Sequence, residues 1–282
     1  MAAETMTVAL IHEVFHGPGR EQRLHERLGQ ARRRGADLAL LPELPLDPWV
    51  PASRNPRDGD AEPPDGPRQR LLAAAARAAG IGVHGGAIVH DAASGERRNR
   101  ALLLDATGRL VATYDKLHLP CEPGFWERDH YGPGDEPPHR VDGFALALGL
   151  QICSDLQRPA GTQLLGALGA EAILAPRATP PESYERWRTV IRADAITSAS
   201  YVVSVNRPAP EGAAPIGGPS IAVAPGGEVL AETTEPLALL RLERAAVAAA
   251  RRDYPGYLDV RAELYARAWA ALCASPRPRR AR

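Results

Sequence analysis

The sequence predicts an α/β fold, because short apolar runs alternate with amphipathic helical stretches along most of the chain. Residues 6–11 and 36–41 are two apolar runs, and residues 20–34 between them carry apolar side chains at helical spacing among charged ones. Gly35 follows this helix directly, as glycine does at many helix ends. A strand, a helix and a second strand in this order predict parallel pairing of the two strands and a right-handed crossover.

The next elements extend this sheet in a different way. Residues 45–67 are rich in Pro, Asp, Gly and Arg and predict a long surface loop. After a helix over 68–79 come three strands that favour an antiparallel meander, at 81–89, 101–104 and 110–114. A glycine pattern of the dinucleotide-binding type, Gly80 to Gly85, lies after a helix and inside a strand. Because that motif requires the reverse order, the sequence indicates no nucleotide cofactor.

The second half of the chain resumes the α/β alternation after a buried strand over 144–152. The elements expected beyond it are helices at 160–168 and 183–200 and strands at 172–175, 201–205, 220–224, 228–231 and 237–242. We expect the Pro/Arg-rich tail, residues 275–282, to be disordered. No internal repeat or linker divides residues 1–274, so the sequence predicts a single domain.

Composition excludes several classes of function. Hydrophobic residues make up 44% of the 282 residues, which indicates a globular chain. The 34 Lys and Arg residues balance 34 Asp and Glu residues, so nothing favours nucleic acid or an anionic membrane as partner. The three cysteines are too few for a disulfide framework and lack metal-site spacing. The chain has no membrane-length apolar run and no signal-peptide pattern at its start, so we expect a soluble cytoplasmic protein. The cysteine spacing gives no reason to expect a bound metal.

Three reactive side chains each follow an apolar strand: Glu43, Lys116 and Cys153. Strand ends of the same sense lie on one edge of a sheet, so we expect these side chains to converge there. A thiolate is a strong nucleophile, a nearby cation favours it, and a carboxylate can accept its proton. The ammonium group, together with the backbone N–H of Ser154, can stabilise an oxyanion. Taken singly, each residue has a commoner explanation, since free cysteines are often core residues and glutamates and lysines are mostly solvated.

The loop after Lys116 carries three aromatic residues, Phe125, Trp126 and Tyr131, in a chain with only 5% aromatic content. Exposed loops rarely hold several aromatic side chains, so we expect this loop to form a pocket wall or a subunit contact. On this basis Trp126 is a candidate substrate-binding residue.

Short motifs in the same order resemble those of the carbon-nitrogen hydrolase, or nitrilase, superfamily, from Val8 to about Tyr265. The main ones are Leu41-Pro42-Glu43, Tyr114-Asp115-Lys116-Leu117-His118-Leu119 and Gly149-Leu150-Gln151-Ile152-Cys153-Ser154-Asp155. The resemblance implies a four-layer αββα sandwich of two mixed β-sheets flanked by helices. It also implies a homodimer or higher homo-oligomer, and an enzyme that needs neither cofactor nor metal.

The resemblance further implies a role for each reactive residue. Glu43 is then the general base, Lys116 the oxyanion stabiliser and Cys153 the nucleophile, and Glu127 positions the substrate and the lysine. The implied reaction is hydrolysis of a non-peptide C–N bond through a cysteine thioester, with release of ammonia or an amine.

Departures from the family pattern bear on the substrate. Ser154 replaces an aromatic residue and Ala160 replaces a carboxylate, which should widen one pocket wall. Asp155 and the loop over 119–135 are most similar to the amidase and N-carbamoyl hydrolase branches. We therefore expect an N-carbamoyl compound or a simple aliphatic amide as the substrate. A nitrile-hydrolysing enzyme, an amide-forming acyltransferase using the same cysteine, and an inactive scaffold remain the alternatives.

Arg177 follows the strand at 172–175, at the edge where the site should lie. A planar guanidinium suits a substrate carboxylate, although pairing with a surface acid explains Arg177 equally well.

Overall fold

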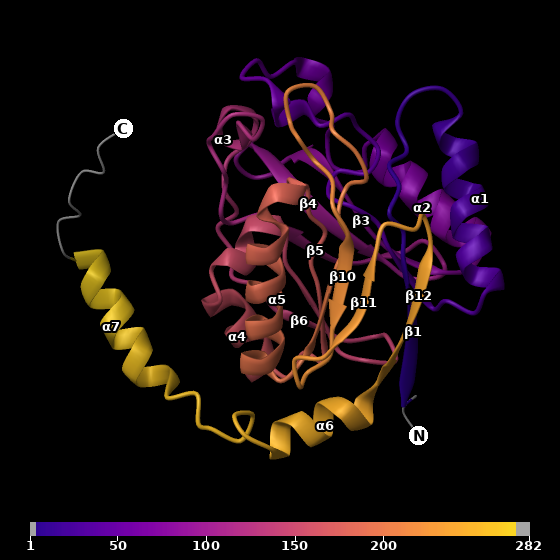
Figure 1. Cartoon of the computed structure of the whole chain (residues 1–282). Coiled ribbons are helices and arrows are strands. Elements are labelled where there is room, and N and C mark those ends of the chain that lie inside the picture. Colours follow the sequence, from indigo (N-terminus) through magenta and orange to yellow (C-terminus); the bar gives the residue numbers. More distant parts are fainter. Residues whose placement is uncertain (1–3, 275–282) are drawn as a thin grey trace.

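The computed structural model describes residues 4–274, whose strands form two six-stranded sheets (Figure 1). The first sheet has the order β12-β1-β2-β3-β4-β5 and the second the order β11-β10-β9-β8-β7-β6. The strands of the first sheet are β1 (Thr5–Leu10), β2 (Leu38–Leu40), β3 (Gly82–His90), β4 (Arg97–Leu104), β5 (Leu110–Asp115) and β12 (Ala238–Glu243). Those of the second are β6 (Arg140–Val141), β7 (Leu148–Leu150), β8 (Ala172–Leu174), β9 (Tyr201–Ser204), β10 (Ser220–Val223) and β11 (Val229–Thr233).

Both sheets are mixed, because each joins parallel and antiparallel pairs. In the first, β1, β2 and β3 pair in parallel, and β3, β4 and β5 form the predicted antiparallel meander. In the second, β7, β8 and β9 pair in parallel, whereas β6 and β10 pair antiparallel to their neighbours. The loops that follow the parallel strands of each sheet therefore lie at the edge where those strands end. In α/β proteins ligands bind at this edge.

Helices cover the outer face of each sheet and complete four layers. Helices α1 (Arg20–Arg33) and α2 (Pro67–Ala79) pack on the first sheet, and α4 (Ala160–Ala167) and α5 (Tyr184–Ser198) on the second. Alternation along β1 shows how the layers form, since Val8 and Leu10 pack between the sheets and Ala9 and Ile11 pack under the helices. The predicted αββα sandwich is confirmed.

Several element boundaries differ from the sequence prediction. The strand expected over 144–152 is only Leu148–Leu150, although its flanking residues are largely buried. Strand β4 begins at Arg97, several residues before its apolar part, because charged residues at its start still pair with β3. Two helices near the C-terminus, α6 (Arg244–Arg252) and α7 (Ala262–Ala274), were not expected.

The chain leaves the sandwich after β12 and forms a C-terminal arm, residues 253–274. Every residue from Tyr257 to Cys273 is exposed, and α7 stands apart from the sheets (Figure 1). The tail that we expect to be disordered, residues 275–282, lies outside the described residues. Among residues 4–274, no helix combines the length and the apolar character needed to cross a membrane.

Candidate active site

The three reactive side chains predicted from strand ends come from two different sheets. Glu43 follows β2 and Lys116 follows β5 in the first sheet, whereas Cys153 follows β7 in the second. The expectation that one sheet carries all three is wrong, because apolar periodicity gives the sense of a strand and not the sheet to which it belongs. The two sheets nevertheless bring the loops together, and Lys116 Nζ lies 2.7 Å from Glu43 Oε1.

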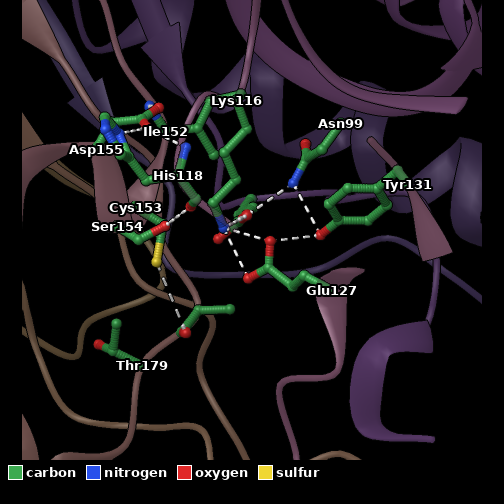
Figure 2. A network of polar contacts seen from close by, with 12 residues as sticks. Asn99, Lys116, His118, Glu127, Tyr131, Ile152, Cys153, Ser154, Asp155 and Thr179 are labelled. Carbon is green, nitrogen blue, oxygen red and sulfur yellow. Dashed lines mark hydrogen bonds and ion pairs between the residues drawn. The ribbon is translucent and has the colours of Figure 1, made fainter. Parts of the chain in front are cut away.

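Lys116 is completely buried between two carboxylates. Besides Glu43, its ammonium group contacts both oxygens of Glu127, at 2.7 and 2.6 Å (Figure 2). Burial by itself lowers the pKa of Lys116, but the negative charges of Glu127 and Glu43 raise it above its ordinary value. Lys116 is therefore a permanently charged cation inside the protein.

Glu127 begins the short helix α3 (Glu127–His130) and is as buried as the lysine. Burial raises the pKa of the Glu127 carboxyl to about 7, although the neighbouring Lys116 charge opposes this shift. The sequence resemblance placed Glu127 beside the lysine, and the geometry brings the two into direct contact.

Two more residues complete this network: Asn99, which the sequence gave no reason to select, and Tyr131, which was expected only as an aromatic residue of a pocket wall or subunit contact. Asn99 Nδ2 donates to Glu43 Oε1 at 2.8 Å and to the Tyr131 hydroxyl at 3.2 Å. The Tyr131 hydroxyl in turn donates to Glu127 Oε2 at 2.7 Å (Figure 2). Asn99 and Tyr131 thus bridge the two carboxylates that hold Lys116.

The second carboxylate oxygen of Glu43 has no hydrogen-bond partner. Oε1 is fixed by Lys116 and Asn99, but Oε2 is buried and unpaired within the described part of the chain. A buried carboxylate oxygen without a donor is costly and is a ready proton acceptor. Oε2 is therefore a free acceptor within the buried network that also holds Lys116.

Cys153 lies at an abrupt end of its strand. Its φ angle is +47°, a left-handed conformation that is unusual outside glycine, and it opens a 3₁₀-helix, η3 (Cys153–Gln157). Cys153 is only 4% exposed, and its thiol donates to the Ala178 carbonyl oxygen at 3.9 Å. Burial raises the pKa of the Cys153 thiol well above its ordinary value, and the Glu43 charge adds to this although Lys116 opposes it. Burial and the Glu43 charge therefore both favour the protonated form of the thiol.

The loop that carries Glu43 is held by an arginine from the opposite sheet. Leu44 also has a left-handed backbone, with φ of +48°. The buried Arg207 guanidinium donates to the Glu43 and Leu44 carbonyl oxygens at 2.8 and 2.7 Å. Arg207 follows β9, so this contact fixes the position of Glu43 relative to the second sheet.

Asp155 ties the Lys116 segment to the Cys153 segment. Its carboxylate is buried and accepts five hydrogen bonds of 2.8 to 3.2 Å, from the N–H groups of Leu117, His118 and Ile152, from His118 Nδ1 and from the Tyr114 hydroxyl (Figure 2). The Ser154 hydroxyl adds a further bond to the His118 carbonyl oxygen. Asp155 therefore acts as a clamp between the ends of β5 and β7.

A cavity of about 240 Å³ opens onto Cys153. Its wall includes Glu127, Ser154 and Phe125, and an outer groove continues it through shared residues such as Ser154. Ser154 lies in the first turn of η3, where backbone N–H groups have no acceptor within the helix. The predicted place of Ser154 at the cavity agrees with this geometry.

Two other predicted substrate-binding residues are placed differently. The wall contains Phe125 and not Trp126, whose ring lies 3.7 Å from the Arg54 guanidinium carbon. The Trp126 ring therefore packs against Arg54, and Phe125 is the aromatic residue of this pair that lines the cavity.

Arg177 is completely buried and does not line the cavity. Its guanidinium nitrogens donate to protein oxygens of Thr179, Ser204 and Pro219. The geometry therefore contradicts direct binding of a substrate carboxylate by Arg177, because all its nitrogens are engaged inside the second sheet.

No group of three or more His, Cys, Asp and Glu side chains within residues 4–274 is arranged to hold a metal ion. Cys153 and Glu127 line the cavity, whereas Lys116 and Glu43 are buried and reach it only through the hydrogen-bond network that includes Glu127.

Comparison with known proteins agrees with this arrangement. The family model described as carbon-nitrogen hydrolase matches residues 7–252. A hydrolase encoded in the pqqF 5′ region of Pseudomonas protegens is 32% identical over 93% of this chain and 91% of its own length. A 2-oxoglutaramate amidase of Paenarthrobacter nicotinovorans is 29% identical over 82% of this chain and 80% of its own length.

Among solved structures, a variant of an amidase from Nesterenkonia sp. AN1 has a TM-score of 0.75 and 25% identity, and covers 94% of this chain and 99% of its own. That structure shows acrylamide added at the active site cysteine of the amidase. The family match spans most of the chain, and the sandwich and its strand-end residues fit it: this chain belongs to the carbon-nitrogen hydrolase family of the nitrilase superfamily.

Proposed function

We propose that this protein hydrolyses a linear amide, either an N-carbamoyl compound or an aliphatic amide, through a thioester on Cys153. The observation that carries the proposal is the buried Glu43 Oε2, a proton acceptor that no donor engages within residues 4–274 and that belongs to the network holding Lys116, while Cys153 lines the cavity. A thiol with a raised pKa cannot attack as a standing thiolate, so a general base must remove its proton during the attack.

In the first half-reaction, Cys153 Sγ attacks the amide carbon and its proton passes to Glu43. The oxygen of the tetrahedral intermediate becomes negative, and the Lys116 ammonium and the Ser154 N–H stabilise it. The C–N bond then breaks, the leaving nitrogen takes the proton from Glu43, and ammonia or an amine departs. Cys153 is left as a thioester.

In the second half-reaction, Glu43 removes a proton from water, which attacks the thioester carbon. The C–S bond breaks, the thiolate recovers the proton, and a carboxylic or carbamic acid leaves. The role of Glu127 is to hold Lys116 in place, since both its oxygens contact the ammonium.

The test is an ammonia-release assay on matched nitriles, aliphatic amides, N-carbamoyl amino acids and N-carbamoyl amines. We expect turnover of at least one amide or carbamoyl compound, and loss of that turnover in Cys153→Ala but not in Cys121→Ala, since Cys121 is an exposed free cysteine. Equal activity of the two variants, or turnover of nitriles alone, would contradict the proposal. Repeating the assay with added amine and analysing the products distinguishes hydrolysis from acyl transfer.

We also propose that the chain assembles as a homo-oligomer through the C-terminal arm. The arm exposes large apolar side chains, among them Tyr257, Leu258, Leu264, Trp269 and Leu272. Clustered exposed apolar residues mark a contact surface more often than a solvated one. A second copy of the chain offers a further apolar surface, because Leu164 in α4 and Leu168, the residue after this helix, are also exposed.

A further inference from the structure

Among the polar side chains around the Cys153 cavity, one arginine has no partner. Arg186 lies in the first turn of α5 and lines the cavity together with Cys153. Within residues 4–274, its guanidinium makes no ion pair and no side-chain hydrogen bond, unlike the neighbouring Arg188, which pairs with Glu232 at 3.2 Å. An unpaired guanidinium at a cavity wall is free to bind an anionic or planar polar group.

Gln157 lines the same cavity and has an unsatisfied donor. Its Nε2 is buried, yet finds no acceptor in the part of the chain that the structure describes. Gln157 ends η3, one turn after Cys153, so its amide is held at a fixed position relative to the sulfur. A buried amide donor without an acceptor costs free energy that a ligand oxygen would recover.

The charges around this space favour an anion. The cavity wall contains Glu127, which Lys116 neutralises, and Glu122. The outer groove contains Glu122 again and adds two arginines, Arg128 and Arg158. Together with Arg186, three arginines therefore surround the entrance and oppose a single unpaired carboxylate.

The N-terminal end of α5 also favours an anion in the cavity. Ser183, the residue at the N-terminal end of this helix, lines the cavity together with Arg186. The N-terminal end of a helix carries a partial positive charge and unpaired N–H groups, which favour an anion nearby.

We infer that the substrate bears a carboxylate at the end opposite the scissile amide, and that Arg186 and Gln157 bind it. This inference rests on the proposed function and assigns the specificity of the same site. Carboxylate binding, predicted from the sequence for Arg177, is thus assigned to Arg186 and Gln157. The nitrogens of Arg177 are all engaged by the protein, whereas these two residues have free donors. The substrate class is then the monoamide of a short dicarboxylic acid or an N-carbamoyl amino acid.

The test compares pairs of substrates that differ only in this carboxylate. The monoamides of succinic and glutaric acid are matched with butanamide and pentanamide, and N-carbamoyl amino acids with the corresponding N-carbamoyl amines. We expect the wild type to prefer the anionic member of a pair. Arg186→Gln should lower kcat/KM for the anionic member about 10- to 100-fold, mainly through KM, and change it less than about twofold for the neutral member.

Two further variants sharpen this test. Gln157→Glu keeps the size of the side chain but repels a carboxylate, so it should penalise the anionic substrate selectively. Arg188→Gln removes a charge from the same helix outside the cavity and should leave the ratio between substrates unchanged. An equal loss for both members of a pair in Arg186→Gln, or no change for either, overturns the inference.

Binding separates this inference from the proposed function. Titration of glutaric acid monoamide into Cys153→Ala, with and without Arg186→Gln, measures recognition without turnover. Weaker binding in the double variant supports the carboxylate site even if the wild type hydrolyses none of the amides, and equal binding overturns it. Wild-type turnover of neutral amides without preference for anionic ones overturns the inference and leaves the proposed function intact.

Discussion

Replacement of Asp155 by asparagine tests whether the clamp between the two sheets sets the geometry of the site. The carboxylate accepts five hydrogen bonds, and an asparagine can accept at only one of its two terminal atoms. The less costly orientation turns the amide nitrogen toward Tyr114 and the Ile152 N–H. The tyrosine hydroxyl can rotate to accept, but the Ile152 N–H then faces another donor.

The expected cost follows from these contacts. One buried N–H without an acceptor costs about 1 to 3 kcal/mol, and the remaining bonds each weaken by about 1 kcal/mol when the carboxylate loses its charge. Three bonds remain at the other oxygen, so we expect Asp155→Asn to lower the free energy of unfolding by about 4 to 6 kcal/mol. For a chain of this size that is a fall in Tm of at least about 8 °C.

The same change should reduce catalysis, because Asp155 binds both the segment after Lys116 and the turn that carries Cys153. A displacement of about 1 Å between catalytic groups can cost about 100-fold in rate, so we expect kcat to fall about 10- to 100-fold with a smaller change in KM.

The assay is urea unfolding together with steady-state kinetics at a temperature where both proteins are folded. Tyr114→Phe is the matched milder variant, since it removes one of the five donors, and it should cost about 1 to 2 kcal/mol. An Asp155→Asn protein with an unchanged unfolding midpoint and an unchanged kcat would refute the reasoning.

Three further predictions concern other parts of the chain. Glu43→Gln removes the proposed base and should lower kcat about 100- to 10,000-fold, whereas Glu122→Gln at the cavity wall should not; a loss under about fivefold for Glu43→Gln counts against its role. His84 is fully buried and burial lowers its pKa to about 3, so the unfolded chain binds a proton there below about pH 6.5 that the folded chain does not, and stability falls as the pH drops. Between pH 7.5 and 5 this loss is about 2 kcal/mol, and His84→Leu should reduce the pH dependence of unfolding by that amount; the same slope in both proteins contradicts it. Truncation after Asp253 should convert the oligomer to a smaller species in light scattering, and an unchanged mass would contradict assembly through the arm.

Local sequence patterns were sufficient for the alternation of strands and helices and for the strand ends that carry the reactive groups, whereas the four layers were predicted only from the family resemblance. A buried strand followed by a small or polar residue is defined by neighbours in sequence, and Glu43, Lys116 and Cys153 each stand at such a point. Helices α6 and α7 were not predicted. Residues 262–273 of α7 are all exposed, so this helix has no apolar stripe packed against a core.

The partners of the reactive groups depended on the tertiary structure. Asn99 lies in a charged stretch of β4 with no motif around it, and it reaches Glu43 only because β4 lies between β3 and β5 in the first sheet. Asp155 belongs to a motif in the sequence, but its contacts could not be predicted from it. They form only because the end of β7 lies next to the end of β5 in the other sheet. Contacts between segments far apart in sequence depend on sheet order and register, which no local pattern encodes.

The sequence by itself determined which chemistry the chain carries: a thiol, an ammonium and a carboxylate at the ends of apolar strands. Only the tertiary structure decided which side chains face the cavity. Phe125 and Trp126 are neighbours, yet only Phe125 lines it, and Arg177 is enclosed while Arg186 is free. The physical reason is that side-chain direction depends on the local backbone conformation and on packing against segments far apart in the sequence, so a site residue is chosen by the packing around it and not by its type.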